Sequence, residues 1–215
     1  MKKIKNILII GPPGSGKDTQ SVLLSKKLKV SFIVMGDLFR QEIKRKSKEG
    51  RRADKLIERG QLAPDEMTFN LLEKRLKRGD TAKGFILDGF PRDSKQARML
   101  EKIAPIDIVL ELWISDQESL RRLAGRRFCP RCKVTYHLIY KKSRRKGICD
   151  KCGGKLIVRD DDKVSVIKKR LAIYHRQTEP IFSYYKREGV HLKINGEPAI
   201  SRVFSEIVRK LKALG

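Results

Sequence analysis

The chain has 215 residues, 40% of them hydrophobic, which is enough for one well-buried core and excludes an unfolded chain. Its 51 Lys and Arg against 25 Asp and Glu give a net charge of +26, a field that attracts nucleotides, RNA or acidic lipid. No apolar run is long enough to span a membrane, and the "MKKIKNILII" start lacks the cleavage site of a signal peptide.

An apolar run at 6–10 is the first of several expected strands. Similar runs follow at 84–90 and 106–114, with a weaker one at 190–194, and their continuous apolar character is typical of parallel strands covered on both faces. Helical patterns occupy the intervals, at 17–29, 36–47, 65–78, 94–102, 116–124, 163–187 and 199–213. This alternation predicts a three-layer α/β fold around a central parallel sheet.

Glycines and a lysine interrupt the first strand–helix pair. Gly11, Gly16 and Lys17 fit the pattern GxxxxGK, in which inward-turned backbone N–H groups and a helix N-terminus hold a phosphate. The alternative is a glycine- and proline-rich turn with a surface lysine, but a strand before the turn and an amphipathic helix after it favour phosphate binding. Asp18 stands where the strict pattern has a hydroxyl residue, and Thr19 follows it.

A second charged constellation ends the strand at 84–90. Asp88 lies where the carboxyl ends of parallel strands gather ligands, and a carboxylate there can hold hydrated Mg²⁺. Arg92 follows Pro91 and offers a guanidinium fork to a phosphate. Taken alone, Asp88 could be a turn residue or a helix cap.

Four cysteines form two close pairs, with the spacing C-x2-C-x16-C-x2-C of a zinc ribbon. Four thiolates close a tetrahedron, which predicts structural rather than catalytic zinc, and a reducing compartment. The alternatives are four free thiols, His137 as a ligand, or a ribbon that grips RNA through "KKSRRKG" at 141–147. The predicted zinc ligands are Cys129, Cys132, Cys149 and Cys152.

Over essentially its full length the chain resembles the adenylate kinase family of nucleoside monophosphate kinases. The resemblance implies a P-loop NTPase fold with a core of residues 1–34, 65–127 and 163–215, a helical insertion for the monophosphate at 35–64, and a zinc-ribbon lid at 128–162. The motifs that carry it are "GPPGSGKDTQ" (11–20), "MGDLFR" (35–40), "ERGQLAPDE" (58–66), "DGFPR" (88–92), "LAGRRFC" (123–129), "VRDDD" (158–162) and "KKRLAIYHRQTEPIFSYY" (168–185).

The resemblance also implies roles for individual residues. The expected catalytic residues are Lys17, Asp88, Arg92, Arg126, Arg159 and Arg170. The expected ATP site comprises Gly11, Gly14, Ser15, Gly16, Lys17, Asp18, Thr19, Arg122, Arg126 and Glu197. The expected AMP site comprises Met35, Gly36, Arg40, Gly89, Arg92, Gln96, Arg159 and Arg170, with the Gln96 amide on the acceptor base.

Two residues depart from the family pattern. Met35 replaces a threonine and has no hydroxyl for the acceptor base, so it either relaxes base selectivity or fills a gap in an apolar wall. Asp18 replaces a glycine; its carboxylate either repels ATP or points outward and favours the helix N-terminus, and we expect the outward orientation.

We therefore expect a monomeric, cytoplasmic enzyme that converts ATP and AMP to two ADP, with Mg²⁺ accompanying ATP and Zn²⁺ stabilising the lid. The alternatives are a kinase for UMP, CMP or GMP, or a basic RNA-binding or assembly protein that retains the fold.

Overall fold

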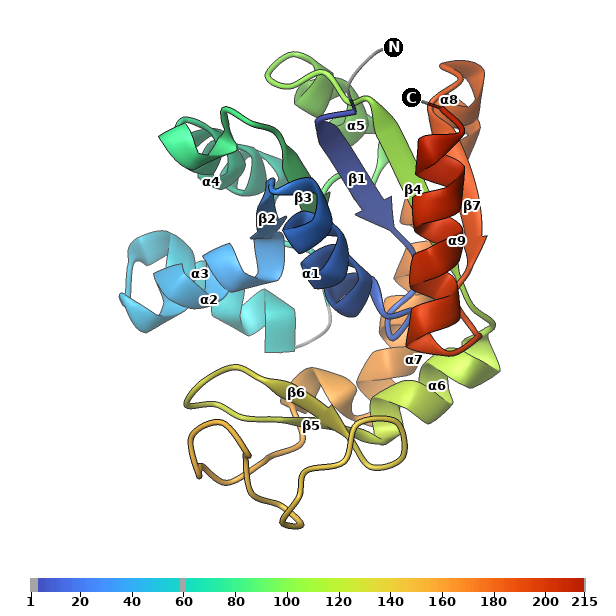
Figure 1. Ribbon diagram of the computed structural model, residues 1–215. Helices are drawn as coiled ribbons and strands as arrows, with labels where there is room; N and C mark the ends of the chain where they lie inside the picture. Colours follow the sequence, from blue (N-terminus) through green and yellow to red (C-terminus); the bar gives the residue numbers. More distant parts are fainter. Residues whose placement is uncertain (1–3, 59–60, 215) are drawn as a thin grey trace.

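Five parallel strands form the sheet at the centre of the computed structural model, which describes residues 4–58 and 61–214 (Figure 1). Their order is β2-β3-β1-β4-β7, and the central strand β1 lies with Ile9 opposite Asp88 on one side and Leu110 on the other. The strands are β1 (Asn6–Ile10), β2 (Ser31–Val34), β3 (Phe85–Asp88), β4 (Ile108–Trp113) and β7 (His191–Asn195). The predicted central parallel sheet is confirmed.

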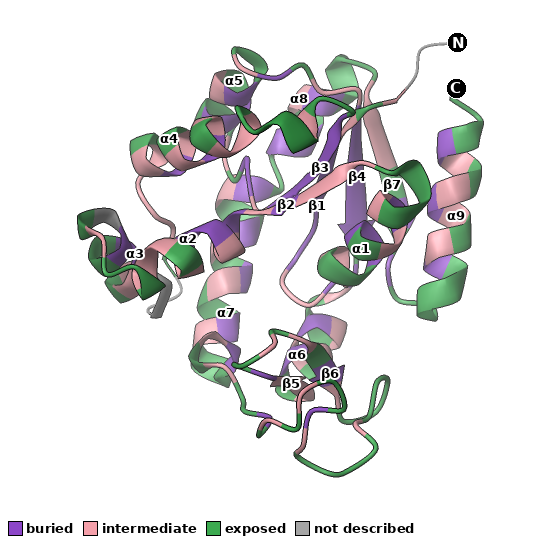
Figure 2. Cartoon of the chain, turned by 60° about the vertical axis from the view of Figure 1, so that its left-hand side comes forward, coloured by how far each residue is buried: buried purple, intermediate pink, exposed green. Residues whose placement is uncertain are grey.

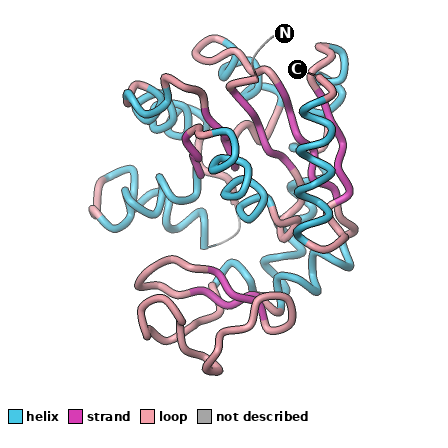
Figure 3. Tube along the Cα trace, in the orientation of Figure 1, coloured by secondary structure: helices cyan, strands magenta, loops and turns pink. Residues whose placement is uncertain are grey.

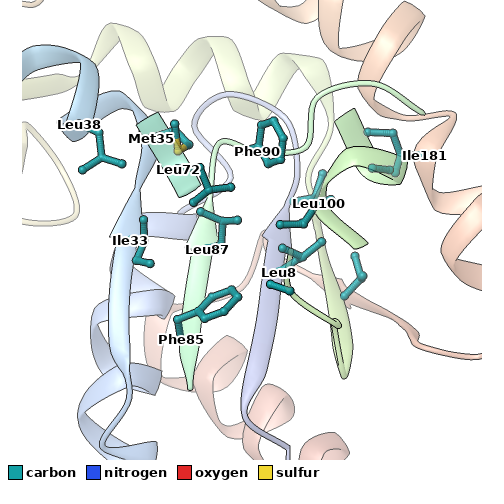
Figure 4. Packing of buried hydrophobic residues seen from close by; sticks show 14 of the residues in the cluster. Leu8, Ile33, Met35, Leu38, Leu72, Phe85, Leu87, Phe90, Leu100 and Ile181 are labelled. Atoms are coloured by element: carbon teal, nitrogen blue, oxygen red, sulfur yellow. The ribbon is translucent and has the colours of Figure 1, made fainter. Parts of the chain in front are cut away.

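Alternation along β1 explains why its sequence is continuously apolar. Leu8 and Ile10 enter one buried cluster, whereas Ile7 and Ile9 enter a second cluster on the other face of the sheet. Successive side chains of a strand point to opposite faces, so a strand covered twice needs apolar residues at every position. Figure 4 shows the first cluster, with Leu8 beside Leu87 on neighbouring strands.

Helices cover both faces and complete the three layers. On the face of Leu8 pack α4 (Asp65–Leu76), α5 (Ser94–Glu101) and α8 (Ile181–Arg187). On the opposite face α1 (Lys17–Leu28) packs beside α9 (Ile200–Lys212), which contributes Val203 and Ile207 to the second cluster. None of the described helices is long and apolar enough to cross a membrane.

Strand β2 was not predicted from the sequence. Its four residues lie at the edge of the sheet, and only Ile33 is buried. The strand also leads directly into α2 (Met35–Lys44), so no turn residues separate the two elements. A short, half-exposed strand next to a helix lacks the continuous apolar run by which its neighbours were recognised.

One predicted helix, 163–187, is divided in the structure, and another, 36–47, is α2 followed by a second helix. The polar stretch after β2 is a helical hairpin of α2 and α3 (Lys48–Glu58), joined at Lys46, whose φ of 55° ends the first helix. The 35–64 segment contains Arg59 and Gly60, which lie outside the described residues. The stretch 163–187 is α7 (Val164–Ile173), the π-helical segment η3 (Tyr174–Thr178) and α8.

The cysteine-containing segment forms a separate lobe of loops (Figure 3). Its two strands, β5 (Arg126–Phe128) and β6 (Thr135–His137), pair antiparallel. Helices α6 (Asp116–Ala124) and α7 connect this lobe to the core and pack together through Leu123 and Ile167. The short 3₁₀ turns η1 (Gly79–Thr81) and η2 (Asp160–Asp162) complete the elements.

Candidate active site

The glycine-rich loop between β1 and α1 is drawn tightly against the sheet. A Cβ on Gly11 would lie 2.2 Å from the Leu112 carbonyl oxygen, and Gly16 has a φ of 90° where α1 begins, so both positions require glycine. The Lys17 ammonium group closes over the loop and donates hydrogen bonds of 2.9 Å to the carbonyls of Gly11 and Pro12. The predicted phosphate loop therefore has its expected strand–loop–helix setting.

Asp88 ends β3 next to this loop and is buried. Burial raises the pKa of the Asp88 carboxyl to about 7, although the positive charge of Lys17 acts in the opposite direction. Burial likewise lowers the pKa of Lys17, against the attraction of Asp88 and Asp18. When it is ionised, a carboxylate at this edge of a parallel sheet can hold a hydrated divalent cation.

Asp18 faces the site, so the expected outward orientation of this side chain was wrong. Its carboxyl group lies close enough to the Asp88 carboxyl that its negative charge further raises the pKa of Asp88. The Asp18 residue remains exposed to solvent, at the mouth of the site. Two carboxyl groups in contact repel when both are ionised, which favours a shared proton or a bound cation.

Three arginines from different segments pair with two aspartates beside the loop, and a fourth, Arg92, lies near them. Arg126 makes a bidentate pair with Asp162, with N···O distances of 2.5 and 2.7 Å, and the Asp162 side chain is completely buried. Arg159 and Arg170 both donate to Asp161, at 2.8 Å and 3.0 Å. Arg92 lies close enough to Asp88 and Asp161 that their negative charges stabilise its guanidinium group.

Burial dominates the electrostatics of this cluster. It lowers the pKa of Arg170 to about 10, with Asp161 acting in the opposite direction. Burial opposes ionisation of Asp161 too, but the nearby Arg170 and Arg159 outweigh it and hold the pKa of this carboxyl below its ordinary value. The cluster concentrates positive charge where it is poorly solvated, which is the condition for tight binding of phosphate groups.

Arg122 and Glu197 meet on the other side of the loop. The Arg122 guanidinium lies 4.0 Å from the position of a Cβ on Gly16, and it donates to Glu118 and to the Glu197 carbonyl at 2.6 and 3.0 Å. The Glu197 carboxylate accepts hydrogen bonds from the Ser115 N–H and hydroxyl. Two predicted ATP-site residues are therefore neighbours in space, 75 positions apart in sequence.

The residues expected around the acceptor are already engaged within the protein. The Gln96 amide accepts from the Arg92 N–H at 2.8 Å and donates to Asp65 at 2.9 Å, which leaves one N–H and one lone pair. Arg40 pairs with Asp37 at 2.6 Å. Met35 is 1% exposed, belongs to the core cluster, and lies against Gly89.

The four cysteines gather as their spacing predicted. All four Sγ atoms lie within 4.8 Å of one another, with contacts of 3.4 Å between Cys129 and Cys152 and 3.3 Å between Cys132 and Cys149. A tetrahedral zinc with Zn–S bonds of about 2.3 Å places its sulfur ligands about 3.8 Å apart. The quartet therefore fits structural zinc in both ligand type and size.

His137 is excluded from this cluster by its hydrogen bonds. Its Nδ1 accepts from the backbone N–H groups of Ile139 and Tyr140, and its Nε2 lies 3.0 Å from the Arg122 carbonyl oxygen. The ring therefore attaches the lid strand β6 to the end of α6, and burial lowers its pKa. The alternative of His137 as a zinc ligand is not supported.

Asp161 and Asp162 were not among the predicted site residues, although they organise the arginine cluster. One signal was available, because three consecutive aspartates directly after Arg159 are unusual in a chain with 25 acidic residues against 51 basic ones. Glu118 was missed as well; it accepts from both Arg121 and Arg122.

Known proteins are similar to this chain along almost its whole length. The sequence model of the family described as "Adenylate kinase" matches residues 9–190. An adenylate kinase of Treponema denticola is 44% identical over 200 residues, which covers 93% of this chain and 96% of the relative. Adenylate kinases of Methanothrix thermoacetophila and Acetivibrio thermocellus are 42% and 39% identical, covering 96% and 97% of this chain and 98% of each relative.

Proposed function

This chain belongs to the adenylate kinase family, and from that membership we propose that it transfers the γ-phosphoryl group of ATP to AMP, giving two ADP. The observation that carries the proposal is the convergence of Lys17, Arg92 and the Asp161–Asp162 arginine cluster at one edge of the sheet. An AMP phosphate oxygen attacks the γ-phosphorus, and the bond to the β–γ bridging oxygen breaks. The attacking oxygen is already negatively charged, so this reaction needs positioning and positive charge rather than a protein nucleophile.

On the donor side, the loop amides and Lys17 would hold the β- and γ-phosphates of ATP. Arg122 and the backbone near Glu197 would extend the site toward the adenine, since both contact one another beside Gly16. The full set proposed for ATP is Gly11, Gly14, Ser15, Gly16, Lys17, Asp18, Thr19, Arg122, Arg126 and Glu197.

On the acceptor side, Arg92 would grip the AMP phosphate, while Arg126, Arg159 and Arg170 would surround the moving phosphoryl group. Asp161 and Asp162 hold three of these guanidinium groups in place beforehand, which reduces the conformational entropy lost when phosphates bind. The full set proposed for AMP is Met35, Gly36, Arg40, Gly89, Arg92, Gln96, Arg159 and Arg170.

Two metals complete the proposal. Asp88 would hold hydrated Mg²⁺, which supplies charge neutralisation on the ATP phosphates. Zn²⁺ would be held by the four cysteines and would give the lid a rigid centre. Bound thiolates require a reducing compartment, which supports the proposed cytoplasmic location. We also propose that the enzyme acts as a monomer.

The acceptor base is the least constrained part of this proposal. Gln96 retains a donor and an acceptor for adenine, but Met35 provides no hydroxyl. A kinase for UMP, CMP or GMP is the alternative. Incubation with ATP, Mg²⁺ and each monophosphate in turn separates these functions. We expect the highest kcat/KM with AMP, with two ADP formed per AMP consumed; absence of turnover with AMP refutes the proposal.

A matched pair of variants tests the site itself. Lys17→Met should lower kcat/KM by roughly 10²–10³-fold, the usual loss when one group that stabilises transition-state charge is removed. Lys26→Met changes an exposed lysine of the same helix and should leave activity unchanged. A bisubstrate analogue that joins the two nucleotides should bind the wild type and Lys26→Met tightly and Lys17→Met weakly; equal binding to all three would place the nucleotides elsewhere.

A further inference from the structure

The lid carries far more positive charge than the reaction can use. In the 29 residues from Cys129 to Ile157, which we call the outer lid, one residue, Asp150, is acidic. In the rest of the chain, basic residues outnumber acidic ones less than twofold. The outer lid has nine basic residues: Arg131, Lys133, Lys141, Lys142, Arg144, Arg145, Lys146, Lys151 and Lys155.

All nine of these side chains belong to exposed residues, and among the described residues none of them has an ion-pair partner. The contrast with the site is sharp, since Arg126, Arg159 and Arg170 are all paired with aspartates. Even Asp150 is occupied, because its carboxylate accepts the backbone N–H of Arg144 at 2.9 Å. The positive charge of the outer lid is therefore not neutralised by ion pairs among the described residues, and none of these nine residues belongs to the proposed nucleotide sites.

The basic loop of the outer lid, residues 141–147, is held in a defined shape. At one end His137 and Lys141 form an antiparallel bridge, and at the other end Ile148 pairs with Lys155 next to the cysteine quartet. Inside the loop the Ser143 hydroxyl donates to the Arg145 carbonyl at 2.9 Å. An ordered array of cations loses less conformational entropy on binding a polyanion than a mobile tail does.

The exposed surface of this loop is polar, which identifies the kind of partner. Exposed apolar side chains of the lid lie on either side of this loop: Leu138 and Ile139 in the turn that is hydrogen-bonded to Gly125 at the end of α6, and Ile157 and Val158 after the cysteines. Residues 141–155 expose no large apolar side chain. A membrane-binding surface combines basic and inserted apolar residues, often on an amphipathic helix, and the described outer lid contains no helix. A polar surface of guanidinium and ammonium groups is instead suited to binding the phosphates of a nucleic-acid backbone.

We propose that the outer lid binds the phosphodiester backbone of a single nucleic-acid strand, RNA or DNA, independently of the kinase reaction. Figure 2 shows these loops as exposed, on the side of the lid that faces away from the sheet and its helices. The strand would follow the loop 141–147 and the turn at Lys151 and Lys155. Recognition would be electrostatic and largely independent of base sequence.

The test compares two variants of equal charge. In the lid variant Lys142, Arg144, Arg145 and Lys146 are all changed to Gln. In the control variant four exposed basic residues of α1 and α9 are changed to Gln, namely Lys26, Lys27, Arg202 and Lys212. Each variant lowers the net charge of +26 by four, so a difference between them reports position rather than total charge. Neither set includes a residue of the proposed nucleotide sites.

Binding is measured by fluorescence anisotropy with labelled 20-nucleotide single-stranded RNA and with DNA of the same sequence, over a salt series. Four lost phosphate contacts should reduce the slope of log K against log salt by about 3, since each contact on a single strand contributes about 0.7. Affinity at physiological salt should fall at least tenfold in the lid variant and change little in the control. Equal losses in both variants, or no measurable binding by the wild type, overturn the proposal.

Two further measurements keep the result interpretable. Cross-linking of the wild type to the labelled strand should map to residues 141–155, and cross-links mainly outside the lid overturn the proposal even if the lid variant misfolds. Co-sedimentation with phosphatidylglycerol vesicles tests the membrane alternative: capture by vesicles without binding of nucleic acid also overturns it. Unchanged kinase activity in the lid variant verifies that the lid is intact.

Discussion

Replacement of Asp162 by asparagine removes the negative charge from a buried arginine–aspartate pair at the base of the lid. The Asp162 side chain is 0% exposed and that of Arg126 is 18% exposed, and the two are joined by hydrogen bonds of 2.5 and 2.7 Å. Asparagine has nearly the same shape, so the substitution leaves packing almost intact. It leaves the Arg126 guanidinium buried without its main counter-charge.

The expected cost is about 3 kcal/mol in the free energy of unfolding. Removal of one partner from a buried pair costs about 3–5 kcal/mol, because the remaining charge is left uncompensated. The lower end applies because the charges of Asp161 and Asp18 still attract Arg126. In a protein of this size, 1 kcal/mol corresponds to about 2–4 °C, so the melting temperature should fall by about 6–12 °C.

Asp160→Asn is the matched control. This aspartate lies two residues away in the same 3₁₀ turn and pairs with Lys163, but its side chain is 77% exposed and that of Lys163 is 66% exposed. An exposed pair contributes about 0–1 kcal/mol. Both variants are unfolded by urea and by heat in the zinc-loaded, nucleotide-free state. If Asp162→Asn is within about 0.5 kcal/mol of Asp160→Asn, the assigned role of this pair is refuted.

Further outcomes follow from the site. Cys149→Ser should lower bound zinc below one per chain and reduce the melting temperature, whereas Ser143→Ala in the same lobe should change neither; metal analysis and calorimetry check this. Ionised Asp88 is the form that holds a cation, and its pKa is about 7, so activity at limiting Mg²⁺ should fall as the pH drops below about 7. Asp18 raises that pKa, so Asp18→Asn should move this acid limb to lower pH; an unmoved limb in the pH–rate profile would contradict the contact. Met35→Thr should lower the free energy of unfolding by about 1–3 kcal/mol through a core cavity, and the returned hydroxyl should raise kcat/KM for AMP relative to GMP by about tenfold, as competing assays would show.

The sheet was largely predictable because its central strands are covered on both faces. The runs at 6–10, 84–90 and 106–114 are apolar at most of their positions, and short runs of this kind between turn residues are typical of buried parallel strands. Edge strand β2 was not predicted, because three of its four residues are only partly buried and the strand lacks a continuous apolar run. The division of the helix at 163–187 was not predicted because the sequence remains helix-compatible through residues 174–178.

The site was predictable where its residues are close in sequence. Lys17 follows its glycines directly, and Arg92 follows Asp88 by four positions. Each motif therefore lies within one short stretch, from which its phosphate- or cation-binding role could be predicted. The pair of Arg126 with Asp162 spans 36 positions, and no local pattern indicates it. The orientation of Asp18 depends on where β3 ends, since Asp88 is the group it meets. Sequence alone could not place that carboxyl.

The π-helical segment in the long C-terminal region restricts how this chain can change in length. At Tyr174 the carbonyl accepts from the N–H of Glu179, five residues on, and Thr178 donates to the Arg92 carbonyl. This turn holds one residue more than an α-helical turn, so deletion of one residue from it would let the same N–H reach the Tyr174 carbonyl as an ordinary α-helical bond. Ile181 and Tyr185 would then still face the core, whereas deletion of one residue within α7 or α8 would rotate the helix beyond it by about 100°. The chain should therefore tolerate the loss of one residue better at 174–178 than in either flanking helix.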